Sequence, residues 1–571
     1  MKRFLSVIIS IVMILALSVN AMAADTAVTI TGDTTNREYK AFMLMEASVS
    51  GTNYAYEVNS KYKDILIEEL GLAATATSKD IVDAVSRITA ADAMRHFSDD
   101  VYRAILVKNL EHDATWTGAN TTLPQGYWLI ADVTNLSGQS KSNSLVMVDT
   151  VGDEEIKIAA KPHDVTTEKK VDDENDSLVN PNPVSEDSEV LQDTADYDIG
   201  DKVPYTIDIK MPNNVAAYKY YSFIIQDSVD KGLTYDETTF KLYVNNTEVT
   251  LAKAGTPEAA TADFIYEIET DTDTVTGEQT AQRLYVYPVS TYTNNAGETV
   301  AASKSNGGDY LAYFGANPDH SKVNNSVVVF KYECTLNENA VVGAAGNPNN
   351  YVLKFTNNPF NDGFGQTPTD TVIVFTYNVT FNKVDSKNAP LEGADFTLYK
   401  FVAAKEQKTD AEMEAAGFVK NETANAWGKY EPVAYKTTNA EAGKATVFSF
   451  NGLDDGIYML EETATPAGYN SIEPVQFQVT ANHVTSITTG SALTGLEAKS
   501  MVGGAITLET QKDTNDIITG EITANVVNRS GSELPSTGGI GRTIFYVTGS
   551  VVFAGAVVFL ITKKRMKEEM E

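Results

Sequence analysis

The chain has 571 residues and a formal net charge of −33 at pH 7, because 77 acidic residues outnumber 44 lysines and arginines. Such an acidic surface repels nucleic acid and anionic lipid, so a nucleic-acid-binding role is excluded. The single cysteine, Cys334, rules out an internal disulfide, but a chain of this length can form several domains with cores of their own.

The N-terminus has the three-part layout of a secretory signal peptide. Lys2 and Arg3 precede an apolar stretch over residues 4–19, and Ala21 and Ala23 supply the small residues that a signal peptidase reads. The apolar stretch is short for a membrane span, which disfavours a retained membrane helix. We therefore expect residues 1–23 to be removed and the mature chain to be secreted.

A mixture of strand and helix patterns follows, up to residue 162. Apolar alternation predicts strands over residues 27–31, 39–45, 127–133 and 144–148. Helical spacing predicts helices over residues 61–70, 78–88 and 98–110, the last with Ser98 as N-cap before Asp99 and Asp100. Residues 24–162 are therefore expected to form an N-terminal α+β domain.

Beyond residue 163 the helical patterns fade. Residues 203–209 alternate between apolar and polar side chains, and similar short runs recur between clusters of Gly, Asn, Asp and Pro. Many short strands with such turns favour antiparallel β-sandwiches. We expect one sandwich over residues 163–377 and a second over residues 378–529.

The C-terminal end, residues 530–571, combines three features in a fixed order. Leu534-Pro535-Ser536-Thr537-Gly538 comes first, then an uncharged apolar run over residues 544–561, then basic residues over 563–567. The apolar run is long enough to span a bilayer, and its basic flank favours the cytoplasmic side. A C-terminal transmembrane helix is therefore predicted.

Taken together, these three features resemble the cell-wall sorting signal of Gram-positive bacteria. Such a signal is read by sortase, a transpeptidase. The resemblance implies recognition of Leu534 and Pro535, cleavage between Thr537 and Gly538, and a new amide bond at Thr537. It makes the chain a substrate that is bonded to something outside the cell, and not a turnover enzyme.

Three polar residues of the last sandwich can react if they meet. Lys383 lies in an apolar first strand, Glu462 follows a strand, and Asn528 ends the last strand. Burying each of them alone would be costly, and burial favours the neutral amine and the protonated carboxyl. A neutral amine can attack the Asn carboxamide while the acid moves the proton, which leaves a Lys–Asn isopeptide bond.

The motif around Glu462 resembles a known family. Residues 456–469 match the pattern Gly-x-Tyr-x-Leu-x-Glu-Thr-x-x-Pro-x-Gly-Tyr almost residue for residue, which is the E-box of Cna-B-type pilin domains. The resemblance implies Lys383 as nucleophile, Glu462 as isopeptide-promoting acid and Asn528 as acceptor. Glu461 is the alternative acid, but it would point to the opposite face of the sheet.

The preceding sandwich resembles the middle domain of major pilins, the backbone subunits of sortase-assembled pili. The matching stretches are residues 196–201, 231–235 and 356–359. The resemblance implies a second isopeptide bond, with Lys170 as nucleophile, Asp227 as acid and Asn357 as acceptor. Asn357 is favoured because it shares strand phase with Leu353 and Phe355. The alternatives are Lys169, Asn349 and Asn358.

The first domain resembles the N-terminal pilin domain at residues 39–42 and 123–128. The family joins subunits through a Tyr-Pro-Lys lysine shortly before the second domain. Lys161 occupies that place, although Ala159 and Ala160 stand where Tyr and Pro are expected. The resemblance thus implies that Lys161 accepts Thr537 of the next subunit, with Lys157 as the rival.

The sequence therefore predicts a mainly β chain: tandem immunoglobulin-like, Cna-B-type sandwiches after an α+β domain, with a C-terminal transmembrane helix. The resemblance implies the backbone of a cell-surface pilus that supports adhesion. Expected partners are sortase, identical subunits, peptidoglycan, minor tip and base pilins and a possible host surface ligand. No cofactor or metal is expected, because the five histidines show no ligand spacing. The rivals are a wall-anchored adhesin or minor pilin, and a wall-anchored hydrolase.

Overall fold

The computed structural model describes residues 25–531 except 33, 51–52, 137–138, 140, 153–154, 160–162, 174–189, 316–317, 360–362, 405–406, 488–491 and 503–505. The expected signal peptide, Lys161, the sorting motif at residues 534–538 and the expected membrane span at residues 544–561 lie outside the described residues. Within the described part of the chain, no helix is long and apolar enough to cross a membrane.

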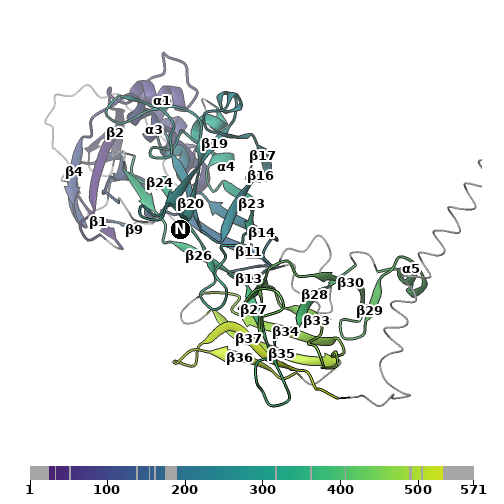
Figure 1. Cartoon of the computed structure of the whole chain (residues 1–571). Helices are drawn as coiled ribbons and strands as arrows, with labels where there is room; N and C mark the ends of the chain where they lie inside the picture. The colour runs from purple at the N-terminus through teal and green to yellow at the C-terminus, as the bar shows by residue number, and fades with distance from the viewer. Residues whose placement is uncertain are drawn as a thin grey trace, which may run out of the picture.

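The described residues form three successive units, and the expected mainly β class is confirmed (Figure 1). In the first unit, strand β1 (Thr26–Thr31) lies between β5 (Asn120–Leu123) and β9 (Glu155–Ala159). A second sheet joins β2 (Glu38–Ser50), β3 (Asn53–Val58), β4 (Ala114–Thr117), β6 (Gly126–Asp132) and β8 (Leu145–Asp149). A short strand β7 (Lys141–Ser142) pairs with β10 (His163–Asp164).

Three helices complete the α+β unit: α1 (Lys63–Glu69), α2 (Ser78–Ser86) and α3 (Ala91–Val107). The prediction that Ser98 caps the last helix is wrong, because α3 begins at Ala91 and the Ser98 hydroxyl donates to the Arg95 carbonyl inside the helix at 2.7 Å. The buried face that includes Phe97 and Val101 extends the helix past the apparent capping signal.

The middle unit packs two sheets face to face. The first sheet has the order β12 (Leu191–Gln192), β11 (Thr166–Asp172), β14 (Lys202–Lys210), β23 (Val327–Leu336), β16 (Leu233–Val244) and β17 (Thr247–Val249). The second has the order β13 (Thr194–Asp196), β26 (Asp370–Phe375), β24 (Asn347–Thr356), β15 (Phe223–Asp230), β20 (Gln279–Pro288), β19 (Phe264–Thr272) and β18 (Leu251–Lys253), with β25 (Phe364–Gln366) beside β24.

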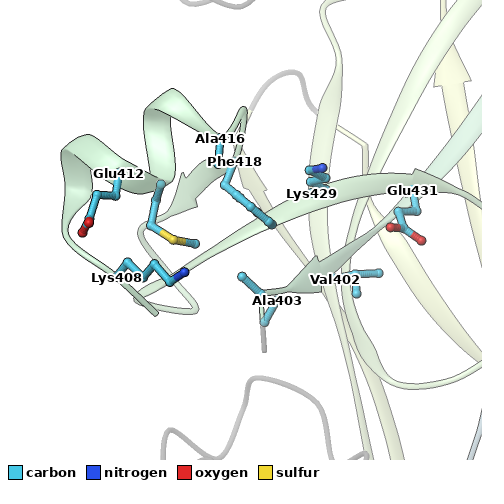
Figure 2. A pocket seen from close by; sticks show the side chains of 10 residues that line it. Val402, Ala403, Lys408, Glu412, Ala416, Phe418, Lys429 and Glu431 are labelled. Atoms are coloured by element: carbon cyan, nitrogen blue, oxygen red, sulfur yellow. The ribbon is translucent and has the colours of Figure 1, made fainter. Parts of the chain in front are cut away.

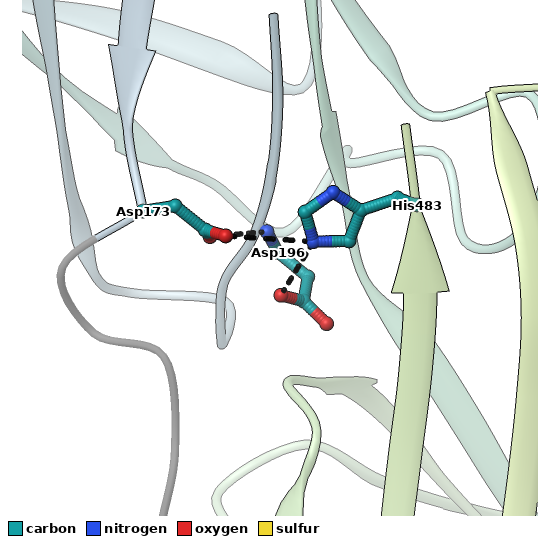
Figure 3. Close-up of side chains that lie close together, drawn as sticks. All are labelled: Asp173, Asp196 and His483. Atoms are coloured by element: carbon teal, nitrogen blue, oxygen red, sulfur yellow. Dashed lines mark hydrogen bonds and ion pairs between the residues drawn. The ribbon is translucent and has the colours of Figure 1, made fainter. Parts of the chain in front are cut away.

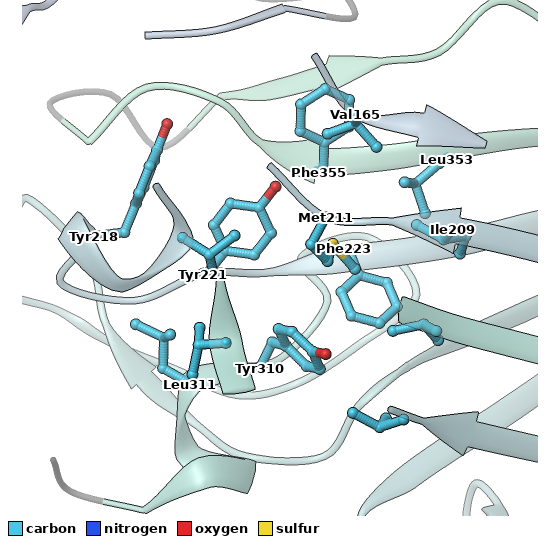
Figure 4. Close-up of a cluster of buried hydrophobic side chains, with 14 of the residues drawn as sticks. Val165, Ile209, Met211, Tyr218, Tyr221, Phe223, Tyr310, Leu311, Leu353 and Phe355 are labelled. Carbon is cyan, nitrogen blue, oxygen red and sulfur yellow. The ribbon is translucent and has the colours of Figure 1, made fainter. Parts of the chain in front are cut away.

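The middle unit also contains shorter elements: η1 (Val215–Ala217), η2 (Pro257–Ala260), β21 (Tyr292–Thr293), β22 (Thr299–Val300), η3 (Leu311–Phe314) and α4 (His320–Val323). The core between the sheets is apolar and aromatic (Figure 4). Ile209 from one sheet meets Phe223 and Phe355 from the other, and Tyr310 closes the end of this core with its ring 5.2 Å from that of Phe223.

The third unit is a second sandwich. One sheet has the order β31 (Lys436–Thr438), β32 (Val447–Leu453), β27 (Tyr377–Val384), β37 (Ile518–Val527) and β36 (Leu508–Lys512). The other has the order β29 (Val419–Asn421), β30 (Ala426–Pro432), β28 (Asp395–Ala403), β33 (Gly456–Ala464), β34 (Val475–His483) and β35 (Leu493–Val502), and α5 (Asp410–Ala415) lies beside β29. The first and last strands, β27 and β37, pair in parallel.

The middle and third units follow each other closely. Only Thr376 separates β26 from β27. Gly343 and Gly520 bring the two backbones into contact: both have positive φ, and a Cβ on Gly520 would lie 2.0 Å from the Gly343 Cα. The Lys400 ammonium of the third unit also bonds the Asp198 carboxylate of the middle unit. A side chain at either glycine would force the two units apart.

Candidate functional site

In the third unit, two sheets bring Lys383, Glu462 and Asn528 together. Lys383 lies near the end of β27, Asn528 directly follows the neighbouring β37, and Glu462 comes from β33 of the facing sheet. The Lys383 Nζ lies 3.9 Å from Glu462 Oε1, and the Asn528 Nδ2 donates to the same oxygen at 2.8 Å. Lys383 and Asn528 are fully buried, and Glu462 is 9% exposed. We refer to these three residues as the third-unit centre.

Burial favours the neutral, nucleophilic form of the Lys383 amine in the third-unit centre. It lowers the pKa of Lys383 to about 8, although the neighbouring Glu462 raises it. A pKa near 8 leaves a useful fraction of neutral amine at physiological pH. The second oxygen of Glu462 accepts from the Ile472 backbone N–H at 3.0 Å, which fixes the carboxyl in place. Glu461 is half-buried and alternates to the other face of β33.

In the middle unit, the residues that meet are Lys169, Asp227 and Asn349. Lys169 lies on β11, while Asp227 and Asn349 lie on the neighbouring strands β15 and β24 of the facing sheet. The Lys169 Nζ donates both to Asp227 Oδ2 and to Asn349 Oδ1, and all three side chains are fully buried. Burial lowers the pKa of Lys169, although Asp227 raises it. We call this set the middle-unit centre.

The hydroxyls of two tyrosines bond Asp227, the acid of the middle-unit centre. The hydroxyls of Tyr235 and Tyr332 both donate to Asp227 Oδ1, at 2.7 and 2.8 Å. The Asn349 Nδ2 donates to the Tyr332 hydroxyl at 3.0 Å. The Lys169 Nζ lies 5.9 Å from the centroid of the Tyr332 ring. No local pattern in the sequence links these tyrosines to the lysine, because they belong to strands far from it along the chain.

The structure does not bring Lys170 and Asn357 to Asp227, so this part of the sequence prediction is corrected. Lys170 follows Lys169 by one residue and therefore faces the other side of β11. Its Nζ pairs with Asp193 at 2.7 Å and Glu168 at 2.8 Å, and its side chain is 20% exposed.

Asn357 has the strand phase of Asn349 but lies beyond the end of β24, about 26 Å further along the chain direction by strand rise. Its Nδ2 donates to the Leu136 carbonyl at 2.7 Å, and the Asn358 Nδ2 donates to the Val133 carbonyl at 3.1 Å. Both asparagines therefore hold the first unit against the middle unit. Asp227 lies opposite Tyr351 in the register of β15 and β24, which brings Asn349 within reach.

The first unit offers no comparable set within its described residues. None of its described lysines is buried, and its buried charged pair is Arg37 with Asp132, whose atoms lie 2.9 Å apart. Lys157 lies on β9, is exposed, and has its Nζ 3.6 Å from Glu155. Lys161 falls outside the described residues, so its role as acceptor of Thr537 stays a prediction, with Lys157 as the rival.

A different cluster lies where the middle and third units meet (Figure 3). The Nε2 of His483 lies 3.5 Å from both Asp173 Oδ2 and Asp196 Oδ1. The ligand atoms of these three residues lie within 4.8 Å of one another, so they could hold a metal ion. No sequence motif indicates this cluster, because its members come from β34 and from the region of β11 and β13.

A cavity of about 600 Å³ opens between α5 and the strands β28 and β30 (Figure 2). Its apolar wall includes Val402, Met413 and Phe418, and Lys429 and Glu431 lie at its charged edge. Its 10 lining residues include neither a histidine nor a hydroxyl side chain, so the cavity holds no nucleophile and base of the serine-hydrolase type.

Comparison with known proteins agrees with this architecture. Residues 377–492 match a family model described as SpaA, prealbumin-like fold domain, and residues 527–569 match the LPXTG cell wall anchor motif. The trypsin-resistant surface T6 protein of Streptococcus pyogenes serotype M6 is 25% identical over 288 residues, which cover 41% of this chain and 48% of that protein. The chain thus spans about half the length of this curated relative.

Two solved structures are similar over most of the chain. The T6 backbone pilin of serotype M6 Streptococcus pyogenes has 14% identity and a TM-score of 0.46, covering 90% of this chain and 100% of that one. The full-length major pilin SpaD from Corynebacterium diphtheriae has 14% identity and a TM-score of 0.38, covering 89% of this chain and 98% of that one.

The two family matches and the T6 relative confirm the resemblance that the sequence motifs indicated. The prealbumin-like domain lies directly before the anchor motif, which is the order expected of a protein held at the cell wall. The chain therefore carries a SpaA prealbumin-like fold domain followed by an LPXTG cell wall anchor motif.

Proposed function

We propose that the chain is the structural backbone subunit of a covalently polymerised pilus. Sortase would cleave after Thr537 and join its carbonyl to Lys161 of the next subunit. The observation that carries the proposal is the pair of buried Lys–acid–Asn centres in a chain that ends in an anchor motif. Such centres suit a protein that must keep its shape outside the cell without disulfides.

In the third-unit centre, the reaction would begin with the neutral Lys383 amine. The amine attacks the Asn528 carboxamide carbon, a carbon–nitrogen bond forms, and the proton that the amine loses passes through Glu462 to the departing nitrogen. Glu462 Oε1 is suited to this transfer, because it accepts from Asn528 Nδ2 and lies near the lysine. Ammonia leaves, and an amide bond joins β27 to the end of β37.

In the middle-unit centre, Lys169, Asp227 and Asn349 would take the same roles. The contacts of Lys169 with both other groups support this assignment over Lys170 and Asn357. The bond would join two residues that are 180 positions apart. By the chain-entropy estimate for disulfides, closing such a loop stabilises the fold by about 5 kcal/mol.

The expected partners follow from polymerisation. They are sortase, identical subunits, peptidoglycan at the base of the fibre, minor tip and base pilins, and a possible host ligand. In this role each of the two centres reacts once, and the subunit turns over no substrate. The rival role is an adhesin or minor pilin joined directly to peptidoglycan, which needs the anchor and the two centres but not Lys161.

The intact mass of the full chain produced without sortase tests the cross-links. We expect a mass below the sequence value by two ammonia molecules, and peptide mapping should recover Lys169–Asn349 and Lys383–Asn528 as joined pairs. A mass equal to the sequence value would refute both bonds. Lys170→Ala is the matched control, because this change should leave both joined pairs in place.

Surface immunoblots of the parent bacterium separate the backbone role from its rival. A high-mass ladder that disappears in Lys161→Ala is the expected result, with Lys157→Ala as control. A single band in the parent would favour the adhesin or minor pilin. A ladder that persists in Lys161→Ala and disappears in Lys157→Ala would move the junction to Lys157.

A further inference from the structure

We infer that Tyr332 is a further catalytic group at the middle-unit centre, which passes a proton from Asp227 to the departing nitrogen of Asn349. The inference rests on the proposed cross-linking function and concerns how that reaction is completed. Tyr332 qualifies because its hydroxyl contacts Asn349 Nδ2, the atom that must leave, at 3.0 Å.

The Tyr332 hydroxyl bridges the acid and the leaving group. It lies on β23, is 2% exposed, and donates to Asp227 Oδ1 at 2.8 Å. A phenol has one proton, and it is used on the carboxylate, so the phenol oxygen accepts from Asn349 Nδ2. This network also orients the amide: its oxygen faces Lys169 and its nitrogen faces Tyr332.

The third-unit centre explains why a bridge is needed here. There Glu462 Oε1 contacts the nitrogen of Asn528 directly at 2.8 Å, so the acid can reach the leaving group itself. Asp227 is one methylene shorter than a glutamate. Within the described contacts it bonds Lys169, Tyr235 and Tyr332, and the nitrogen of Asn349 is reached through Tyr332. The hydroxyl thus spans the distance that the shorter side chain leaves.

The proton transfers balance. The Lys169 ammonium first gives one proton to Asp227, and the neutral amine attacks the Asn349 carbon while the C=O electron pair moves to the oxygen. Tyr332 then gives its proton to Nδ2 and regains one from Asp227. The carbon–Nδ2 bond breaks and ammonia leaves, and Asp227 takes the remaining extra proton from the new amide nitrogen. Burial raises the pKa of Tyr332 well above its usual value, so the phenol stays protonated until this step.

Tyr235 provides a matched control. Its hydroxyl donates to the same Asp227 oxygen at 2.7 Å, and its side chain is also buried, but none of its described hydrogen bonds reaches Asn349. Tyr332→Phe removes both the bond to the acid and the bond to the leaving group. Tyr235→Phe removes only the bond to the acid. Both changes keep the aromatic ring and its packing.

The test follows bond formation after synthesis of the full chain, by peptide mapping of each joined pair over time. Tyr332→Phe should slow formation of Lys169–Asn349 by about a hundredfold or more, the lower end of the range for losing a proton-transfer group. Tyr235→Phe should slow it far less, because Tyr332 still connects the acid to the leaving group. Lys383–Asn528 should form at the parent rate in both variants and so reports that each chain has folded.

A second readout separates proton transfer from packing. In D₂O the parent should form Lys169–Asn349 more slowly, and Tyr332→Phe should show a smaller solvent isotope effect. Equal rates in the two phenylalanine variants, or an unchanged isotope effect, would overturn the role of Tyr332. If the parent itself lacked the Lys169–Asn349 bond, the proposed cross-linking function of the middle unit would fail instead.

Discussion

The two centres use the same three kinds of group but distribute them differently over their sandwiches. In the third unit, lysine and asparagine lie on neighbouring strands of one sheet, and the acid comes from the facing sheet. In the middle unit, acid and asparagine are neighbours, and the lysine comes from the facing sheet. One bond would therefore tie strands within a sheet, and the other would tie two sheets together. The chemistry needs three convergent groups, and the fold can supply them in more than one way.

The largest expected effect comes from removing each bond separately, which tests whether the two centres form and stabilise their units independently. Lys169→Met and Lys383→Met should each lose one joined pair and lower the free energy of unfolding on the order of 5 kcal/mol, because each change removes a long closed loop. Differential scanning calorimetry should show a lower unfolding temperature for the middle unit in Lys169→Met and for the third unit in Lys383→Met. If Lys169→Met lost the Lys383–Asn528 pair as well, the two centres would not be independent.

An intermediate effect concerns pH. Because the pKa of Lys383 is lowered to about 8 and the neutral amine is the nucleophile, formation of Lys383–Asn528 should speed up as the pH rises toward 8 and level off above it. The rate at pH 6 should be roughly a hundredfold below the plateau. Time-resolved peptide mapping of newly made chain measures this profile. A flat profile between pH 6 and 9 would contradict control by the amine.

The smallest effect concerns the contact between the first and middle units, which involves no Lys–Asn pair among the described residues. His320 Nε2 lies 2.6 Å from Asp100, and its Nδ1 lies 3.6 Å from Asp99 of the same helix α3. Burial alone would lower the pKa of His320, but hydrogen bonds to both carboxylates raise it from 6.5 to about 9. Burial raises the pKa of the Asp99 carboxyl, although its contacts with His320 and Asn324 lower it.

A raised pKa stabilises the folded state fully below pH 6.5, and this contribution is lost as the pH rises through about 9. Hydrogen exchange in α3 should therefore increase between pH 7 and pH 10 beyond the intrinsic rise. His320→Gln should exchange faster at pH 7 and lose the additional pH dependence. An identical pH response in the variant would exclude His320 as the cause.

The sequence predicted the mainly β fold and the α+β first unit, because alternation and helical spacing are local signals. It also named Lys383, Glu462 and Asn528, which the structure brings together. The middle unit was harder, since Lys169 and Lys170 differ only by the face of a strand, and a shift of one residue in register exchanges them. Asn349 and Asn357 are an even number of residues apart and so fall on the same face of a strand. The alternation of side chains therefore cannot show which of them is the acceptor.

Other parts of the sites were beyond local reasoning. Tyr332 reaches the middle-unit centre from a strand more than a hundred positions after Asp227, as their separation of 105 shows. The group of Asp173, Asp196 and His483 forms only because two units meet. Such contacts depend on which strands become neighbours in the fold, and no short sequence motif encodes the pairing of distant strands.

The parallel pairing of β27 with β37 has a consequence for how far a subunit can stretch. With both bonds formed, a chain pulled from its ends would pass tension from Lys169 to Asn349, along β26 and β27 to Lys383, and out through Asn528. The 180 positions between Lys169 and Asn349 would then stay outside the loaded path. Fully extended, that segment alone would add roughly 600 Å of slack. The cross-linked subunit should therefore behave as a nearly inextensible link.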